Sequence, residues 1–180
     1  LPISGYRNDT VNTLRLWKST STTAFDLDDF NRGSYAEAVE AKNEAEHITM
    51  VLYPNDASES GKELRLKQQY LLASASLKDV VRKWEKTHGD SYDNFAEYNV
   101  FQMNDTHPTI AVAELMRILM DDKRLTWDDA WNITTSTMAY TNHTLLPEAL
   151  EMWPVDMMQR LLPRLMEIIF HINERFLHDI

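Results

Sequence analysis

Cysteine is absent from this 180-residue chain, and basic residues are scarce, with 18 Lys and Arg against 28 Asp and Glu. Without cysteine, a disulfide framework and any thiolate metal site are excluded, and a cytoplasmic location is expected. The net charge of -10 argues against a nucleic acid partner, because phosphate binding needs a basic face. No run of eighteen apolar residues is present, so we expect neither a membrane-spanning helix nor a membrane partner.

The remaining composition is that of a folded domain. Hydrophobic residues make up 43% of the chain, which is enough for one sizeable core. The first residue is Leu1, and the last residues continue an apolar helical pattern at Phe176 and Leu177. We therefore expect residues 1–180 to form a single incomplete domain of a larger protein.

The spacing of apolar residues predicts short strands and longer helices. Residues 11–18 alternate between two faces and predict a strand, and residues 98–103 predict a second one. Residues 19–33 are rich in Ser, Thr, Asp and Gly and predict a loop. Helices are predicted over residues 34–52, 62–87, 155–162 and 163–176, and after positions 106 and 126. This order of elements predicts a helix-rich α/β fold.

Capping residues mark the ends of several predicted helices. Ser34 begins a capping box, Thr126 precedes two aspartates that favour a helix N-terminus, and Gly89 is a C-terminal stop. Residues 106–108 are expected to open another helix, with proline in its first turn. The helix that runs from Ser34 to Leu52 has a thin apolar stripe, so we expect it to project or to pack on a partner.

Two polar stretches interrupt the apolar helical sequence, and each contains a histidine. Residues 104–108 are Asn-Asp-Thr-His-Pro; residues 140–144 are Tyr-Thr-Asn-His-Thr, followed by Leu-Pro-Glu-Ala-Leu-Glu at 146–151. Unpaired polar groups cost free energy in a core, whereas imidazoles, carboxylates and amides together suit a site for a hydroxyl-rich ligand. The first stretch also follows a predicted strand, where open α/β sheets bind ligands.

Other interpretations of these residues remain open. Asp105 or Thr106 accepts helix N–H bonds as a cap while His107 merely packs, or the second stretch is a polar loop with His143 hydrogen-bonded in the core. A metal site built from Asp105, His107 and His143 is a third interpretation, although no His-x-x-x-His or His-x-His spacing supports it. The many carboxylates also allow a hydrolase pair, but nothing in the sequence singles out two of them.

The sequence resembles the α-glucan phosphorylases, the family of glycogen, starch and maltodextrin phosphorylases. The resemblance covers nearly all of the chain and rests on several ordered segments rather than on one motif. The matching segments are residues 5–8, 11–17, 51–56, 61–68, 104–108, 140–144, 146–151 and 161–164.

The resemblance implies that the chain is the middle section of the N-terminal domain of a two-domain glycosyltransferase fold of the B type. It implies that the intact protein uses inorganic phosphate to remove the non-reducing-end glucose of an α-1,4-glucan as α-D-glucose 1-phosphate, with retained configuration. Pyridoxal phosphate is the implied cofactor and acts through its phosphate group, with its lysine outside this chain. The isolated chain is therefore expected to be inactive.

The resemblance also implies roles for individual residues. His143 resembles the family histidine that faces the transferred glucose and whose backbone carbonyl stabilises developing positive charge, so it is the expected catalytic residue. Asp56 lies in a segment that resembles the family's mobile gate, and it is expected to contact substrate. The other expected substrate-contact residues are Asp105, His107, Thr144, Ala149 and Glu151.

Expectations about partners follow from the same resemblance. The helix from Ser34 to Leu52 resembles the family's tower helix, which contacts a second subunit, so a homodimer is expected. Arg82 and Lys83 stand where animal members carry an arginine pair for a nucleotide phosphate. Because lysine lacks the bidentate fork of arginine, nucleotide activation is not expected. The alternative to an enzyme is a non-enzymatic, acidic helical module that self-associates.

Overall fold

A computed structural model describes residues 1–22, 30–178 and 180, apart from the side chains at positions 37, 38, 41 and 149. By their internal contacts the residues divide into two compact units, Leu1–Gln68 and Gln69–Ile180. Each unit is described by itself below.

The first unit contains a short antiparallel hairpin and one helix. Strand β1 (Pro2–Ser4) pairs with β2 (Val11–Thr13), with Ile3 opposite Asn12. The strand predicted over residues 11–18 therefore ends at Thr13. Both strands are exposed along their whole length, so no buried face forces the alternating pattern to continue as a strand.

Helix α2 (Tyr35–Met50) confirms the helix predicted over residues 34–52. Ser34 is its N-cap residue, but the Ser34 side chain makes no capping hydrogen bond, so the predicted capping box is wrong. The predicted loop over residues 19–33 lies partly outside the described residues.

Helix α3 (Glu59–His88) is the longest element and confirms the helix predicted over residues 62–87. Leu77, Val81 and Trp84 form the buried stripe in its second half. Gly89 ends it with a φ of +65°, and the Gly89 N–H donates to the Glu85 carbonyl at 3.0 Å. A left-handed residue at this position favours glycine because glycine has no Cβ.

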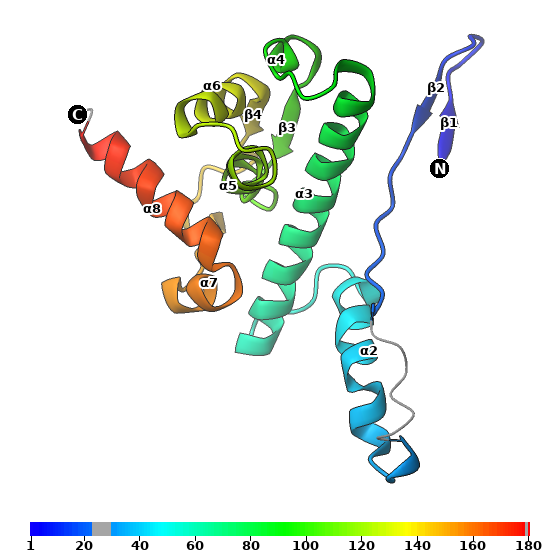
Figure 1. The fold of residues 1–180 in the computed structure, drawn as a ribbon. Helices are drawn as coiled ribbons and strands as arrows, with labels where there is room; N and C mark the ends of the chain where they lie inside the picture. The colour runs from blue at the N-terminus through cyan, green and yellow to red at the C-terminus, as the bar shows by residue number, and fades with distance from the viewer. Residues whose placement is uncertain (23–29, 179) are drawn as a thin grey trace. The chain divides into compact units, whose positions relative to one another are not determined.

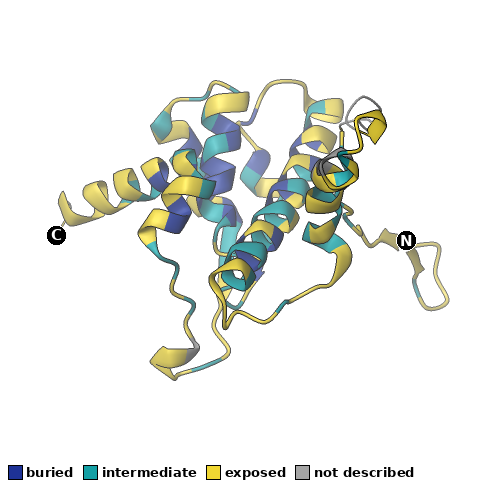
Figure 2. Cartoon of the chain, turned by 90° about the horizontal axis from the view of Figure 1, so that it is seen from below, coloured by how far each residue is buried: buried dark blue, intermediate teal, exposed yellow. Residues whose placement is uncertain are grey.

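The core of the second unit is built from helices that pack on one another. Helix α5 (Ala111–Arg117) continues into a π-helical turn (Ile118–Asp122) and packs against α6 (Trp127–Thr137) and α8 (Pro163–His178). The largest fully buried apolar side chains are Phe95, Leu115, Met116, Ile118, Leu119, Leu165 and Ile168. Figure 2 shows this buried interior, with the C-terminal end of α8 exposed.

Capping chemistry places α6 where the sequence predicts it. Thr126 is its N-cap residue, and the Thr126 side chain accepts a hydrogen bond from the Asp129 N–H. Helices α7 (Val155–Leu161) and α8 confirm the predictions over 155–162 and 163–176.

Two short strands form a parallel pair in the second unit. Strand β3 (Phe101–Asn104) pairs with β4 (Met138–Thr141), with Phe101 opposite Met138 and Asn104 opposite Thr141. The strand predicted over residues 98–103 starts too early, because Tyr98 ends the short helix α4 (Phe95–Tyr98). β4 is absent from the sequence prediction, since four residues without a buried face give little periodicity to detect.

The described residues thus form a helix-rich α/β protein, as predicted (Figure 1). No helix among them is long and apolar enough to cross a membrane.

Candidate functional site

The two polar stretches leave the parallel strand pair at the same edge. β3 and β4 run in the same direction, and the Asp105 N–H donates to the Thr141 carbonyl at 2.8 Å, one step beyond the strand pairing. Residues 104–108 therefore continue from β3 where residues 142–144 continue from β4. The carboxyl edge of a parallel strand pair is where α/β sheets place ligand-binding side chains.

A side-chain hydrogen bond joins the two stretches directly. The Nε2 atom of His143 is hydrogen-bonded to Oδ1 of Asn104, the last residue of β3. The chain around His143 is held by local bonds: Asn142 Nδ2 donates to the Thr144 carbonyl at 2.8 Å, and the Leu146 N–H donates to Thr144 Oγ1 at 3.3 Å. Both histidine-containing stretches thus belong to one edge of the second unit.

Asp105 adopts a backbone conformation that is uncommon for a residue with a side chain. Its φ is +67°, and its Oδ1 atom accepts a hydrogen bond from the Thr106 N–H at 2.7 Å. Aspartate tolerates the left-handed region because its short carboxylate bonds locally to the backbone. Such strain often accompanies functional positions, and here it turns the chain sharply at the end of β3.

The helix expected to open at residues 106–108 begins later, which corrects two interpretations. Helix α5 starts at Ala111, its N-cap residue is Ile110, and no side chain caps it. Residues 106–111 instead form tight turns, in which the Thr109 N–H donates to the Thr106 carbonyl at 3.1 Å. Asp105 therefore does not act as a helix cap, and its carboxylate lies at the carboxyl edge of β3 and β4.

His107 faces a carboxylate that comes from much further along the chain. Its Nε2 atom lies 3.9 Å from Oε1 of Glu151. Gln69 Nε2, from α3, donates to both carboxylate oxygens of Glu151 at 3.0 and 3.1 Å. The Glu151 side chain is only 15% exposed, so this amide contact satisfies a largely buried charge. Sequence reasoning missed Gln69, because one glutamine on a helix surface gives no signal.

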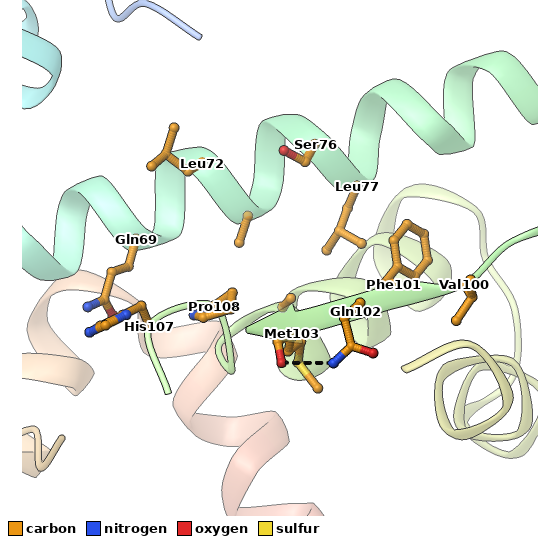
Figure 3. A pocket seen from close by; sticks show the side chains of 12 residues that line it. Gln69, Leu72, Ser76, Leu77, Val100, Phe101, Gln102, Met103, His107 and Pro108 are labelled. Carbon is orange, nitrogen blue, oxygen red and sulfur yellow. Dashed lines mark hydrogen bonds between the residues drawn. The ribbon is translucent and has the colours of Figure 1, made fainter. Parts of the chain in front are cut away.

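A cavity of about 450 Å³ adjoins this cluster, between α3 and β3. Gln69 and His107 lie together at one end of it, and Val100 and Phe101 lie at the other (Figure 3). Apolar side chains such as Leu72 dominate the lining. Gln69 and His107 supply the polar groups at the end where the edge and the cavity meet, and Ser76 and Gln102 supply polar groups further along it.

The remaining predicted site residues are Thr144, Ala149 and Asp56. Thr144 is partly buried beside His143 in the chain, whereas the side chain of Ala149 lies outside the described residues. Asp56 belongs to the first unit, where its Oδ2 atom pairs with Nη1 of Arg65 at 2.6 Å. The Arg65 guanidinium also lies 4.1 Å from the centre of the Tyr53 ring, so Asp56 is tied to the start of α3.

The polar side chains at this edge determine which ligands it can bind. Asp105 and Glu151 supply carboxylates, Asn104 and Gln69 supply amides, and two imidazoles complete the set. These groups can accept and donate hydrogen bonds to hydroxyls and can attract a developing positive charge. Among the described residues no cluster of three His, Asp or Glu side chains is arranged to hold a metal ion.

The edge does not have the residues that a pyridoxal Schiff base requires. No lysine follows Lys123 in the sequence, and the side chains that line the adjoining cavity include none. Lys123 itself pairs with Glu85 at the far end of α3. The residues present therefore do not fit pyridoxal phosphate.

Imidazoles, carboxylates and amides on one strand edge of a helix-rich α/β unit are groups that can hydrogen-bond to a hydroxyl-rich ligand such as a carbohydrate. The family model described as carbohydrate phosphorylase matches residues 1–180, and the chain belongs to that family. It is 51% identical to the muscle form of glycogen phosphorylase from Mus musculus, over 99% of the chain.

Similar identity extends to distant organisms. The chain is 52% identical to glycogen phosphorylase from Chlamydia pneumoniae, over its full length, and 52% identical to glycogen phosphorylase 2 from Dictyostelium discoideum, over 98% of its length. It spans only 22%, 22% and 18% of the mouse, Chlamydia and Dictyostelium proteins.

Proposed function

We propose that this chain is part of an α-1,4-glucan phosphorylase. The whole protein would use inorganic phosphate to release α-D-glucose 1-phosphate from the non-reducing end of a glucan, with retained configuration. Support comes from the family membership and from relatives of about 50% identity that are named glycogen phosphorylases. The chain would be the middle section of the N-terminal domain of a two-domain glycosyltransferase of the B type.

In this proposal the carboxyl edge of β3 and β4 forms one wall of the glucan site. The observation that supports it most strongly is the parallel register, which brings residues 104–108 and 142–144 to the same edge. Imidazole and carboxylate groups at such an edge can hydrogen-bond to several sugar hydroxyls at once. The contact residues would be Asp105, His107, His143, Thr144, Ala149 and Glu151.

His143 would act on the reacting sugar through its position and its backbone dipole. Cleavage of a glycosidic bond passes through a transition state with oxocarbenium character. A carbonyl dipole aimed at the anomeric carbon, near the carboxylates of the same wall, lowers the energy of that positive charge more than it lowers the energy of neutral substrate. In the whole protein, pyridoxal phosphate would supply acid–base chemistry through its phosphate group. The residues that hold the cofactor would lie outside this chain.

Asp56 would serve at the entrance rather than at the reacting bond. Its loop begins with Tyr53, a non-glycine residue at a φ of +60°, and Arg65 holds Asp56 and the Tyr53 ring together. Gln68 also holds this loop, since its Oε1 atom accepts from the Tyr53 N–H at 3.1 Å and its Nε2 atom donates to the Val51 carbonyl at 2.7 Å, so the loop would open only when these contacts break together. This arrangement supports a gate whose closed state depends on Arg65.

The partner in this proposal is a second copy of the protein, in the cytoplasm, joined through α2. The exposed apolar residues Met50, Val51 and Leu52 at the end of that helix support it, since they are 63%, 65% and 71% exposed. They equally support the non-enzymatic alternative, a self-associating helical module.

An activity assay distinguishes the enzyme from the module. The full-length protein that carries this sequence is incubated with maltoheptaose and phosphate, and glucose 1-phosphate is measured. We expect turnover by the full-length protein, a large loss in His143→Ala, and no turnover by the 180-residue chain. Inactivity of the full-length protein would overturn the enzyme proposal, and turnover by the short chain would refute our assignment of the cofactor and phosphate sites to other regions.

A further inference from the structure

We propose that Asn104 is a positioning residue that fixes both the ring orientation and the tautomer of His143. The hydrogen bond between Asn104 Oδ1 and His143 Nε2 carries this inference. It rests on the proposed function and deepens it, because it specifies which ring nitrogen of His143 is available to a ligand.

The strand register explains why these two side chains meet. Asn104 lies opposite Thr141, the last residue of β4. Along an extended chain, residues two apart point to the same side, so the residue two positions beyond Thr141 is directed toward the side of Asn104. That residue is His143, and the turn made by Asn142 and Thr144 keeps it there.

The chemistry of the amide oxygen determines the tautomer. A carbonyl oxygen can only accept a hydrogen bond, so Nε2 of a neutral His143 must carry the proton. The other ring nitrogen, Nδ1, then carries a lone pair and acts as an acceptor. A sugar hydroxyl that approaches His143 from the open side would therefore donate to Nδ1, and the ring would be oriented before substrate arrives.

The location of Asn104 also suits a positioning role. It is the final residue of β3, so its backbone is fixed by the pairing with β4, and the Asp105 N–H bond to Thr141 extends that pairing by one step. His143, in contrast, lies in an irregular segment after β4. A fixed strand residue can thus restrain a histidine whose own backbone belongs to no regular element.

Nuclear magnetic resonance on the 180-residue chain labelled with ¹⁵N-histidine tests the inference directly. The chain has 6 histidines, and His143→Gln identifies the signals of His143. We expect the neutral ring to be protonated at Nε2, with its proton protected from exchange with water. Protonation at Nδ1 would overturn the proposal, because the amide of Asn104 would then be the donor.

Three variants separate positioning from general stability. Asn104→Leu should speed exchange of the Nε2 proton by about fivefold, the factor for one net hydrogen bond of ~1 kcal/mol. Asn104→Asp retains an acceptor oxygen, but its carboxylate favours the charged imidazolium, so its spectrum is recorded at a pH where the ring is neutral, and Nε2 should there remain the protonated nitrogen. Asn132→Leu, an equivalent change on the exposed surface of α6, is the control. Equal exchange rates in Asn104→Leu and wild type would refute the role of Asn104, and so would a neutral ring protonated at Nδ1 in Asn104→Asp with the fold intact.

Kinetics on the full-length protein then tests the link to function. Asn104→Leu should lower kcat for phosphorolysis roughly tenfold while KM for phosphate stays unchanged, since only the sugar wall is altered. Normal kcat together with a released His143 ring would refute the proposed role of His143 in the reaction, although Asn104 would still position that ring.

Discussion

The contact that should matter most to the stability of the second unit is the buried pair Glu114 and Arg117. Glu114 is 0% exposed, and it accepts hydrogen bonds from Arg117 Nε at 2.8 Å, from Arg117 Nη2 at 2.9 Å and from Ser74 Oγ at 2.6 Å. The hydrogen bonds that Arg117 donates to Glu114 raise the pKa of Arg117 even though burial opposes this shift. The pair and Ser74 together connect α5 to α3.

Arg117→Met removes two of the three hydrogen bonds to Glu114 and leaves its carboxylate buried without an opposite charge. Loss of one partner of a buried pair costs about 3–5 kcal/mol, a large fraction of the 5–15 kcal/mol that stabilises a typical domain. A combined variant, Arg117→Met with Glu114→Leu and Ser74→Ala, replaces the whole cluster by apolar groups. It should recover part of that loss, because no buried charge remains unpaired, while the partly buried Tyr70 hydroxyl loses Ser74 and Arg117 as hydrogen-bond partners.

Urea unfolding followed by tryptophan fluorescence measures these differences. Asp122→Asn is the matched control: Asp122 also bonds to Arg117, at 3.1 Å, but is 39% exposed, so its loss should cost less than about 1 kcal/mol. Our reasoning would be refuted if Arg117→Met cost no more than this control. It would be refuted equally if the combined variant were as unstable as the single one.

Three further predictions concern other parts of the second unit. The hydrogen bond from Arg164 lowers the pKa of Asp121, although burial opposes it, so this pair stabilises the fold above the ordinary aspartate pKa, and the contribution is lost as pH falls through the lowered pKa. Asp121→Asn should therefore reduce the unfolding free energy by about 0.5 kcal/mol at neutral pH and by nothing in acid, in urea titrations at both pH values, after allowance for its partial exposure. Gln69→Leu should raise KM for glucan about tenfold in the full-length protein, because Glu151 loses its amide donor; an unchanged KM would exclude Glu151 from the sugar wall. Gly89→Ala should lower stability by about 1 kcal/mol, since the cost is that of a left-handed alanine alone and an added Cβ would meet nothing within 4 Å; a thermal melt that matches wild type would contradict it.

The elements that sequence reasoning predicts well are those with local determinants. The long helix α3 combines a buried stripe with a terminal glycine, and α6 has Thr126 as a hydrogen-bonding cap. Each of these signals depends on residues close together in the chain. They fix the helices to within a few residues.

The elements that the sequence does not predict depend on distant partners. β4 has four residues and exists because it pairs with β3. The late start of α5 follows from the sharp turn at Asp105. No spacing rule covers either case, because a strand of this length is defined by its neighbour rather than by its own periodicity.

The candidate site also has features that the sequence predicts and contacts that it does not. The polar stretches with His107 and His143 are visible in the sequence, because polar residues interrupt apolar helices there. The contacts that join them, from Asn104 to His143 and from Gln69 to Glu151, span 39 and 82 positions. The first pairing becomes visible only when the register of β3 and β4 is known, and the second only when α3 is placed beside the segment that contains Glu151.

The central claim is that the two histidine-containing stretches form one sugar-binding wall. A crystal structure of the full-length protein with a bound maltooligosaccharide tests it most directly. We predict that hydrogen bonds from one sugar chain reach residues of both 104–108 and 142–144, with His143 closest to the terminal glucose. A sugar chain bound in the catalytic cleft that contacts only one of the two stretches, or neither, would contradict the account.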